Sequence, residues 1–184
     1  DFLTERPITV RCRTHKASLR EIVTSLKSQG VTVEQAPYLP YALKISDYNH
    51  ILTLETFLQG KILVQDVSSM LVAEAASPKK GDHIIDMCAA PGGKSIHAAD
   101  KMGDYGNVDA RDVSQYKADL IKENIHRTGV INVEARVQDA TVYDPDSEQA
   151  ADIVIADVPC SGYGVIGKKP EISTMTFTGL LSAT

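Results

Sequence analysis

The segment from residue 83 to 156 alternates between short apolar runs and helical patterns, and this alternation constrains the fold more than any other feature. Strands are predicted at 83–88, 107–112, 131–137 and 152–156, and helices at 92–102 and 114–128. Strands that alternate with helices form a parallel sheet joined by right-handed crossovers. The sequence therefore predicts an α/β domain, which we place at residues 65–184 and which begins with a helix from Gln65 to about Ala76.

Residues 1–64 lack this alternation, and we expect them to form a separate, small α+β subdomain. Strands are predicted at 8–13, at 31–34 and near 52–54. The first strand alternates apolar and polar residues, which indicates a half-buried strand with Arg11 and Arg13 on its open face. Ser18 and Glu21 match a capping box, which predicts a helix that begins directly after Ser18.

The composition is that of an ordinary globular protein, because 43% of the 184 residues are hydrophobic and 23% are charged. No apolar run is long enough to span a membrane, and no signal peptide is recognisable. The three cysteines, Cys12, Cys88 and Cys160, are widely spaced, and the five histidines show no ligand spacing. We therefore expect no disulfide framework, no metal site and a reducing, cytoplasmic location.

Charge is distributed unevenly along the chain. The net charge is −5, of which residues 1–44 carry +3 and the remainder −8. A basic segment beside an acidic remainder favours contact with a polyanion such as a nucleic acid. The alternative is that these charges are exposed and interact only with solvent.

A loop of small residues joins the first predicted strand of the α/β domain to its helix. It lies within Ile-Ile-Asp-Met-Cys-Ala-Ala-Pro-Gly-Gly-Lys-Ser, residues 84–95. Small residues let a backbone approach a ligand closely, and the free amides at a helix N-terminus attract an anionic group. The loop matches neither the Walker A pattern nor the dinucleotide-binding Gly-x-Gly-x-x-Gly pattern. Both kinds of phosphate loop are therefore disfavoured.

Carboxylates follow the next three predicted strands, at Asp112, Asp139 and Asp157. Ligands of open α/β sheets bind beyond the carboxyl ends of the strands, where these side chains are expected to meet the loop. S-adenosylmethionine fits such a layout. Its carboxylate would face the loop amides, its ribose Asp112, its adenine amine Asp139 and its amino group Asp157. For each aspartate taken alone, a loop or capping role is the alternative.

The stretch Asp157-Val158-Pro159-Cys160 places an acid and a thiol at the end of the last predicted strand. A positioned acid and thiol together suggest covalent chemistry on an electrophilic carbon. The alternative is that Cys160 only packs in a turn, since a buried cysteine is usually inert.

Two strings in the chain resemble the RsmB/Nop2/Sun (NSUN) family of RNA 5-methylcytosine methyltransferases. They are Asp-Met-Cys-Ala-Ala-Pro-Gly-Gly-Lys-Ser at 86–95 and Asp-Val-Pro-Cys-Ser-Gly-Tyr-Gly at 157–164, and 64–69 also match the family. The similarity covers residues 5–172 and is greatest to the bacterial 16S rRNA enzymes. It implies a Rossmann-like, S-adenosylmethionine-dependent methyltransferase fold with an incomplete parallel sheet, preceded by an RRM-like subdomain that helps to grip RNA.

The resemblance also implies an activity and a set of site residues. The activity is cytosine-C5 methylation of RNA, with rRNA as the leading substrate and tRNA as the alternative. A thiolate adds to cytosine C6, and Asp157 is the candidate acid near N3. The implied catalytic residues are Cys160 and Asp157. The implied cofactor-binding residues are Cys88, Ala89, Ala90, Pro91, Gly92, Gly93, Lys94, Asp112, Asp139 and Asp157.

The sequence departs from this family in one respect that bears on catalysis. The family's attacking cysteine lies in a Thr-Cys-Ser-like motif after a fifth strand, and the Pro-Cys cysteine, here Cys160, assists release of the methylated RNA. No Thr-Cys pair occurs in this sequence, and no upstream NusB-like domain is present. We therefore expect the chain to be a fragment that is inactive alone. The competing hypotheses are a non-catalytic RNA-binding scaffold and, disfavoured by the loop, a nicotinamide oxidoreductase.

Overall fold

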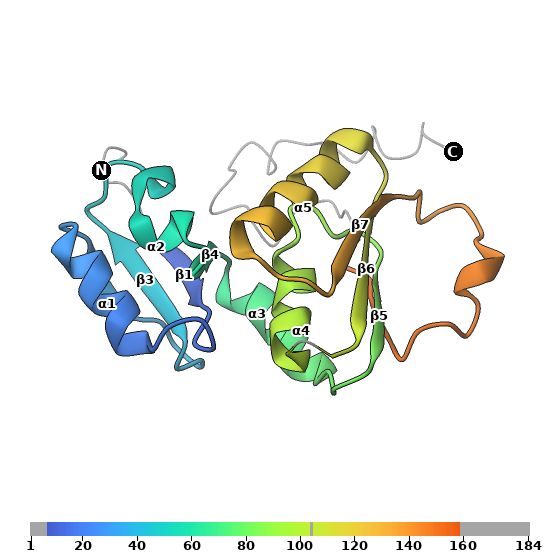
Figure 1. Cartoon of the computed structure of the whole chain (residues 1–184), viewed down its shortest axis with the longest axis horizontal. Coiled ribbons are helices and arrows are strands. Elements are labelled where there is room, and N and C mark those ends of the chain that lie inside the picture. Colours follow the sequence, from blue (N-terminus) through green and yellow to red (C-terminus); the bar gives the residue numbers. More distant parts are fainter. Residues whose placement is uncertain (1–6, 104, 159–184) are drawn as a thin grey trace, which may run out of the picture.

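The computed structural model describes residues 7–103 and 105–158, and it contains two four-stranded sheets. Figure 1 shows the N-terminal sheet on one side, the second sheet on the other, and helices α3 (Val67–Ala76) and α4 (Gly93–Met102) between them. Helix α4 therefore borders both sheets, and its N-terminus follows the predicted ligand loop.

The first sheet is antiparallel, with strand order β2-β3-β1-β4. Its elements follow one another as strand, helix, strand, strand, helix and strand, which is the ferredoxin-like arrangement. One face packs on helix α1 around Val10, Ile22, Leu26 and Ile45. The elements are β1 (Ile8–Cys12), α1 (Leu19–Ser28), β2 (Thr32–Gln35), β3 (Ala42–Ser46), α2 (Glu55–Leu58) and β4 (Ile62–Val64).

Helix α1 begins as the sequence predicts. Ser18 Oγ accepts a hydrogen bond from the Glu21 amide, and the Glu21 carboxylate accepts one from the Ser18 amide at 2.8 Å. The strand predicted near 52–54 is wrong, because Ile51–Thr53 forms a 3-10 turn. Leu54 directly after the turn is apolar because it packs in the core. Strands β3 and β4 were not predicted, and β4 has only three residues and forms by pairing with β1.

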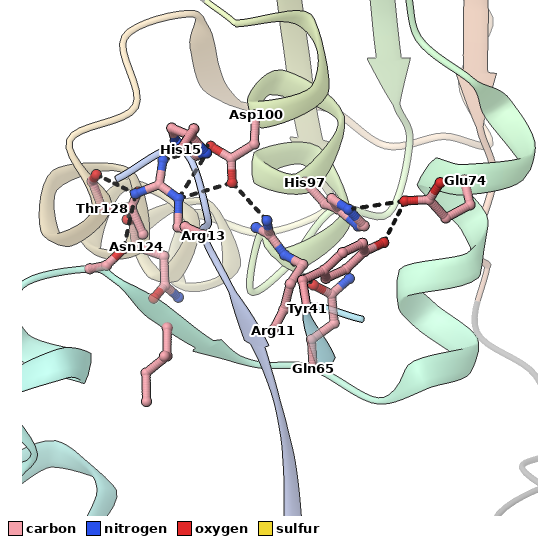
Figure 2. Close-up of polar contacts among 12 residues, drawn as sticks. Arg11, Arg13, His15, Tyr41, Gln65, Glu74, His97, Asp100, Asn124 and Thr128 are labelled. Carbon is pink, nitrogen blue, oxygen red and sulfur yellow. Dashed lines mark hydrogen bonds and ion pairs between the residues drawn. The ribbon is translucent and has the colours of Figure 1, made fainter. Parts of the chain in front are cut away.

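The predicted exposure of Arg11 and Arg13 is also wrong. Both side chains are at most 2% exposed, and both form ion pairs with Asp100 of α4, at 2.7 and 2.6 Å (Figure 2). Arg13 also donates to the carbonyl of Thr128, at 2.6 Å, and to that of Gly60, at 3.0 Å. The polar face of β1 is therefore the contact surface between the two domains, and alternation in the sequence cannot distinguish such a contact from solvent.

A glycine is required where the turn before β4 meets the end of helix α5 (Gln115–Thr128). Gly60 has a φ of +63°, and a Cβ atom there would lie 2.5 Å from the Arg127 carbonyl oxygen. This close approach brings the Gly60 and Thr128 carbonyls to the same Arg13 guanidinium.

The second sheet is parallel, with strand order β7-β6-β5-β8, and this confirms the predicted α/β fold. Helices α4 and α5 cover one face, over a core that includes Ile84, Val108, Ala110 and Ile121. The chain moves from β5 to β6 and β7 on one side and returns to β8 on the other, so the order reverses at β5. The strands are β5 (His83–Asp86), β6 (Asn107–Asp112), β7 (Val133–Val137) and β8 (Ile153–Ile155).

The other face of this sheet carries Ile85 and Val154 beside an ion-pair cluster of Asp109, Arg111 and Arg136. Val154 of this face is 57% exposed. Within the described residues, no helix is both long enough and apolar enough to cross a membrane.

His97 of α4 is buried at the domain contact and provides a test of that contact. It packs edge-on against Tyr41 with ring centroids 5.6 Å apart, and its Nε2 lies 3.8 Å from Glu74 (Figure 2). Burial lowers the pKa of His97 to about 3, and the charge of Arg11 acts in the same direction, whereas Asp100 and Glu74 raise the pKa and Lys101 lowers it. The unfolded chain would bind a proton near pH 6.5.

We expect the free energy of unfolding to fall as pH falls from about 6.5 towards 3, because the unfolded state takes up the His97 proton first. Asp86 acts oppositely, since burial raises its pKa to about 6 and the folded state then takes up its proton first. Urea unfolding of wild type and His97→Gln at pH 7.5, 5.5 and 4.5 separates the two effects. The wild type should lose about 1 kcal/mol more per pH unit than the variant. Parallel pH profiles would contradict this.

Candidate active site

The loop after β5 lies across the carboxyl ends of three strands. The Met87 amide donates to the Ile155 carbonyl of β8 at 2.9 Å, and the Ala89 amide donates to the Arg111 carbonyl of β6 at 2.8 Å. Gly92, with a φ of +99°, turns the chain into α4. The amide of Ile96 makes the helix's bond to Gly92, so the three amides before Ile96 precede its hydrogen-bond ladder. The sequence therefore builds an anion-attracting turn at the strand ends.

Asp112 is fixed at the end of β6, directly beside this loop. Its carboxylate accepts hydrogen bonds from the Ala90 amide at 3.0 Å and the Val113 amide at 2.8 Å, and it pairs with Lys117 at 3.0 Å. Burial raises the pKa of Asp112, but the hydrogen bonds from Lys117, Ala90 and Val113 outweigh burial and hold the pKa below its usual value. Asp112 is therefore a charged acceptor with a fixed orientation.

Asp139 lies beyond β7 and is joined to this group through the backbone. The neighbouring Gln138 amide donates to the Asp112 carbonyl at 2.9 Å. The Asp139 carboxylate accepts from the Thr141 amide at 2.9 Å, and the Thr141 amide and hydroxyl together lower the Asp139 pKa. Asp139 also lines a mostly apolar cavity of about 290 Å³, together with Met87, Val142 and Val154 among others. A flat, apolar ring with a polar edge would suit this cavity.

Lys94 and Asp157 form an ion pair between the first turn of α4 and the segment after β8. Lys94 Nζ lies 2.5 Å from Asp157 Oδ2, and the Asp157 side chain is 58% exposed. Lys94 is in the first turn of α4, and Asp157 lies two residues beyond β8. An exposed carboxylate held by a lysine at the strand ends can bind a polar ligand edge and keep its charge in a fixed place.

Asp86 and Ser95 form a buried hydrogen bond that connects the end of β5, before the loop, with the first turn of α4, after it. Asp86 is fully buried, and Ser95 Oγ donates to its Oδ2 at 2.6 Å. Burial raises the pKa of Asp86 to about 6, although the Ser95 hydrogen bond and the Lys94 charge act in the other direction. The Cys88 amide also lowers this pKa, yet among the described residues no hydrogen bond of ordinary geometry reaches Asp86 Oδ1.

The cysteines differ in their surroundings. Cys12 is packed in the core of the first sheet, and burial raises its pKa to about 12. Burial, and then the charges of Asp112 and Asp86, raise the pKa of Cys88, so its sulfur remains a thiol at neutral pH. Cys160, the predicted catalytic cysteine, lies outside the described residues.

The structure thus brings the loop of residues 88–94 together with Asp112 and Asp157 by direct contact, and Asp139 by a backbone connection. Sequence reasoning missed Asp86, Ser95, Val113 and Lys117. Asp86 ends its strand just as the other three aspartates follow theirs, and this was a usable signal. Val113 belongs to the site because its amide donates to Asp112. Its side chain is 55% exposed, and no pattern in the sequence predicts this.

A cleft of about 600 Å³ separates the loop from the N-terminal subdomain. Its walls come from both domains. They include Ile8 and Thr9 of β1, Val64, Gln65 and Ser69 at the junction, and Ala89, Pro91 and Lys94 of the loop region. Lys94, which pairs with Asp157 at the strand ends, therefore also borders this cleft.

Comparisons with known proteins identify the family to which the chain is similar. The family model described as 16S rRNA methyltransferase RsmB/F matches residues 73–178. A probable ribosomal RNA small subunit methyltransferase B from Bacillus subtilis is 37% identical over 165 residues, which are 89% of this chain and 37% of that protein. The human 28S rRNA (cytosine(4447)-C(5))-methyltransferase is 33% identical over 171 residues, which are 92% of this chain and 21% of that protein. The chain therefore spans little more than a third of the Bacillus subtilis protein and about a fifth of the human protein.

Solved structures of methyltransferases are similar to this chain in fold. A methyltransferase homologue from Pyrococcus horikoshii has a TM-score of 0.75 and 28% identity, over 96% of this chain and 55% of that chain. NSun6 from Pyrococcus horikoshii with SFG has a TM-score of 0.74 over 86% of this chain and 64% of that chain, and at 23% identity it supports the fold alone. The fold is that of S-adenosylmethionine-dependent methyltransferases, and the chain belongs to the RsmB/F family of 16S rRNA methyltransferases.

Proposed function

We propose that the protein containing these residues transfers a methyl group from S-adenosylmethionine to C5 of a cytosine in ribosomal RNA. The observation that carries this proposal is the Lys94–Asp157 pair, 2.5 Å apart, held beside the amides of the α4 N-terminus. The names of the Bacillus subtilis and human relatives supply the nucleic-acid class and, for the human protein, the C5 position. Because the chain spans only part of each relative, the activity is assigned to the complete gene product.

The residues present fit the proposed cofactor. Asp112 Oδ2 accepts one hydrogen bond, from Ala90, and an oxygen of this kind can accept another from a ribose hydroxyl. The α4 amides suit a carboxylate, and the cavity beside Asp139 suits adenine. S-adenosylmethionine would supply an electrophilic methyl group at this site.

The chain's own residues can handle the charge that develops on cytosine. C5 becomes nucleophilic once a thiolate has added to C6 of the ring; after C5 has taken the methyl group, a base removes the C5 proton and the C6–S bond breaks to release the thiolate. We assign Asp157 to the N3 side of the ring, where a carboxyl group can share a proton with the adduct. Lys94 holds Asp157 in place. Cys160 follows by three residues and is assigned to release of the methylated product.

The proposed RNA partner is assigned to the cleft and not to the first sheet. RRM domains bind bases by stacking them on aromatic side chains of the sheet. In β1–β4, the face opposite α1 includes Thr9, Arg11, Ala42 and Lys44, and none of these strands contains an aromatic residue. Arg11 is moreover buried against α4. A role of residues 1–64 in gripping RNA stays a prediction, as does a cytoplasmic location.

Transfer of tritium from labelled S-adenosylmethionine tests the function. The complete gene product is incubated with ribosomal RNA or with tRNA, and the labelled nucleoside is identified after digestion. We expect label in 5-methylcytidine from ribosomal RNA. Label in methyladenosine or in protein would contradict the proposed reaction, and label only in tRNA would contradict the proposed substrate.

A further inference from the structure

Gln65 is a buried glutamine at the junction of the two domains. Neither the resemblance of residues 64–69 to the family nor the proposed chemistry explains why a glutamine is buried there. The residue is 6% exposed, and its side-chain Oε1 accepts a hydrogen bond from Arg11 Nε at 2.9 Å. Its side-chain Nε2 is buried and has no hydrogen-bond partner among the described residues. Burying an amide nitrogen without a partner costs free energy, so its presence at this position requires a reason.

The side chain of Gln65 lies against the first turn of helix α4. A Cβ atom added to Gly93 would lie 3.7 Å from Gln65 Cδ and 4.0 Å from Nε2. Gly93 is the first residue of α4, and its amide is among those that precede the helix's hydrogen-bond ladder. Gln65, Gly93 and Lys94 also share the wall of the cleft of about 600 Å³. The amide of Gln65 therefore borders the turn that attracts an anionic group.

The same glutamine is connected to the body of α4 through Arg11. Arg11 Nη1 donates to Asp100 Oδ2 at 2.7 Å, and Asp100 lies seven residues after Gly93 on the same helix. Figure 2 shows Gln65 and Arg11 side by side, with Asp100 beyond Arg11. Because Asp100 is also held by Arg13, Arg11 has a fixed orientation, and the chain Gln65–Arg11–Asp100 contacts α4 both at its first turn and near its end.

We propose that Gln65 is a positioning residue for the first turn of α4, so that the N-terminal subdomain sets the geometry with which this turn receives the carboxylate of the cofactor. The proposal rests on the proposed function, because the carboxylate belongs to S-adenosylmethionine. It assigns to residues 1–64 a task in cofactor binding in addition to any contact with RNA. The adenosine half of the cofactor is assigned to Asp112 and Asp139, so Gln65 and Arg11 should not affect its binding.

A pair of ligands separates positioning from ordinary packing. S-adenosylhomocysteine carries the amino-acid carboxylate, whereas 5′-methylthioadenosine contains the adenosine and sulfur but no carboxylate. Calorimetry with the complete gene product measures both dissociation constants. The variants are Gln65→Met, which keeps the volume and removes the acceptor, and Gln65→Glu, which keeps an acceptor for Arg11 and adds a negative charge at the turn. Gln59→Met is the matched control, since Gln59 is exposed and bonds only within its own helix region.

We expect both Gln65 variants to bind S-adenosylhomocysteine about five- to tenfold more weakly, the size of one ordinary hydrogen bond weakened at the misplaced turn. Binding of 5′-methylthioadenosine should stay within about twofold, and Gln65→Glu should keep the wild-type melting temperature because the contact to Arg11 remains. Equal weakening of both ligands, or no weakening of either, would overturn the inference while leaving the proposed function intact. A wild-type protein that binds neither ligand would overturn the proposed function, and this inference with it.

Discussion

Replacement of Asp100 by alanine is expected to lower the free energy of unfolding by about 3–5 kcal/mol, the largest stability effect of any single change proposed for this chain. The Asp100 side chain is 6% exposed, and it pairs with two arginines whose side chains are at most 2% exposed. Removing it leaves both guanidinium groups buried without their counter-ion. Breaking a buried pair on one side costs far more than the pair contributes, because the remaining charge stays desolvated.

Two further observations agree with a large effect. Burial raises the pKa of Asp100, but the hydrogen bond from Arg13 and the charge of Arg11 outweigh it and hold the pKa below its usual value. The carboxylate therefore stabilises the fold above a pH of about 4, and this stabilisation is lost as pH falls through the lowered pKa. Asp100 also joins β1 to α4, so its loss should weaken the contact between the two domains.

Urea unfolding at pH 7.5, followed by circular dichroism, measures the effect. Asp119→Ala is the matched control, because Asp119 is also a helical aspartate with a basic partner, Lys122 at 3.6 Å, but both side chains are more than half exposed. The control should change the free energy of unfolding by less than about 0.5 kcal/mol. A loss below about 1 kcal/mol for Asp100→Ala would show that the arginines find other partners and would contradict the account of the domain contact.

Asp157→Asn is expected to reduce methyl transfer to RNA by about 100-fold or more, the usual contribution of a positioned acid or base. Asparagine keeps the size of the side chain but cannot share a proton with the cytosine ring. The side chain is 58% exposed, and its ion-pair partner within residues 7–103 and 105–158 is Lys94 alone, so the fold should be retained. The measurement is the rate of tritium transfer to ribosomal RNA, with the melting temperature as a check on folding.

Lys94→Met removes the other member of the same pair. If Lys94 acts by holding Asp157, the double variant should be little slower than the slower single variant, because residues that act as a unit give non-additive losses. Lys122→Met serves as the control for loss of a helical lysine whose partner is an exposed aspartate. Asp157→Asn with a transfer rate within about threefold of wild type would exclude Asp157 from the chemical step.

The sequence predicted the second domain better than the first, for a physical reason. Strand β6 was predicted with its observed bounds, and β5, β7 and β8 within a few residues, because β5 and β8 contain short apolar runs and β6 and β7 alternate apolar and polar residues. In the first domain, β4 owes its three-residue strand to pairing with β1, and no local pattern marks it. Arg11 and Arg13 looked exposed because alternation shows which residues share a face, not what covers that face.

In the candidate site too, local sequence patterns predicted some features, whereas others depend on the tertiary fold. The aspartates at 112, 139 and 157 could be found because Asp112 ends a strand and the other two follow theirs, and the parallel sheet then places them at one edge. The 2.5 Å contact between Lys94 and Asp157 joins residues 63 positions apart, and the packing of Gln65 against Gly93 joins residues 28 positions apart. Such contacts depend on the tertiary fold, and spacing in one sequence does not encode them.

Mapping of 5-methylcytosine in the host's ribosomal RNA tests the central claim most directly. Bisulfite sequencing would compare cells that carry the gene, cells that lack it, and deletion cells complemented with the wild-type gene or with the gene encoding Asp157→Asn. We predict that one cytosine of the ribosomal RNA loses methylation on deletion, and that the wild-type gene restores it whereas the Asp157→Asn gene does not. An unchanged pattern of 5-methylcytosine in the ribosomal RNA of the deletion cells would contradict the account.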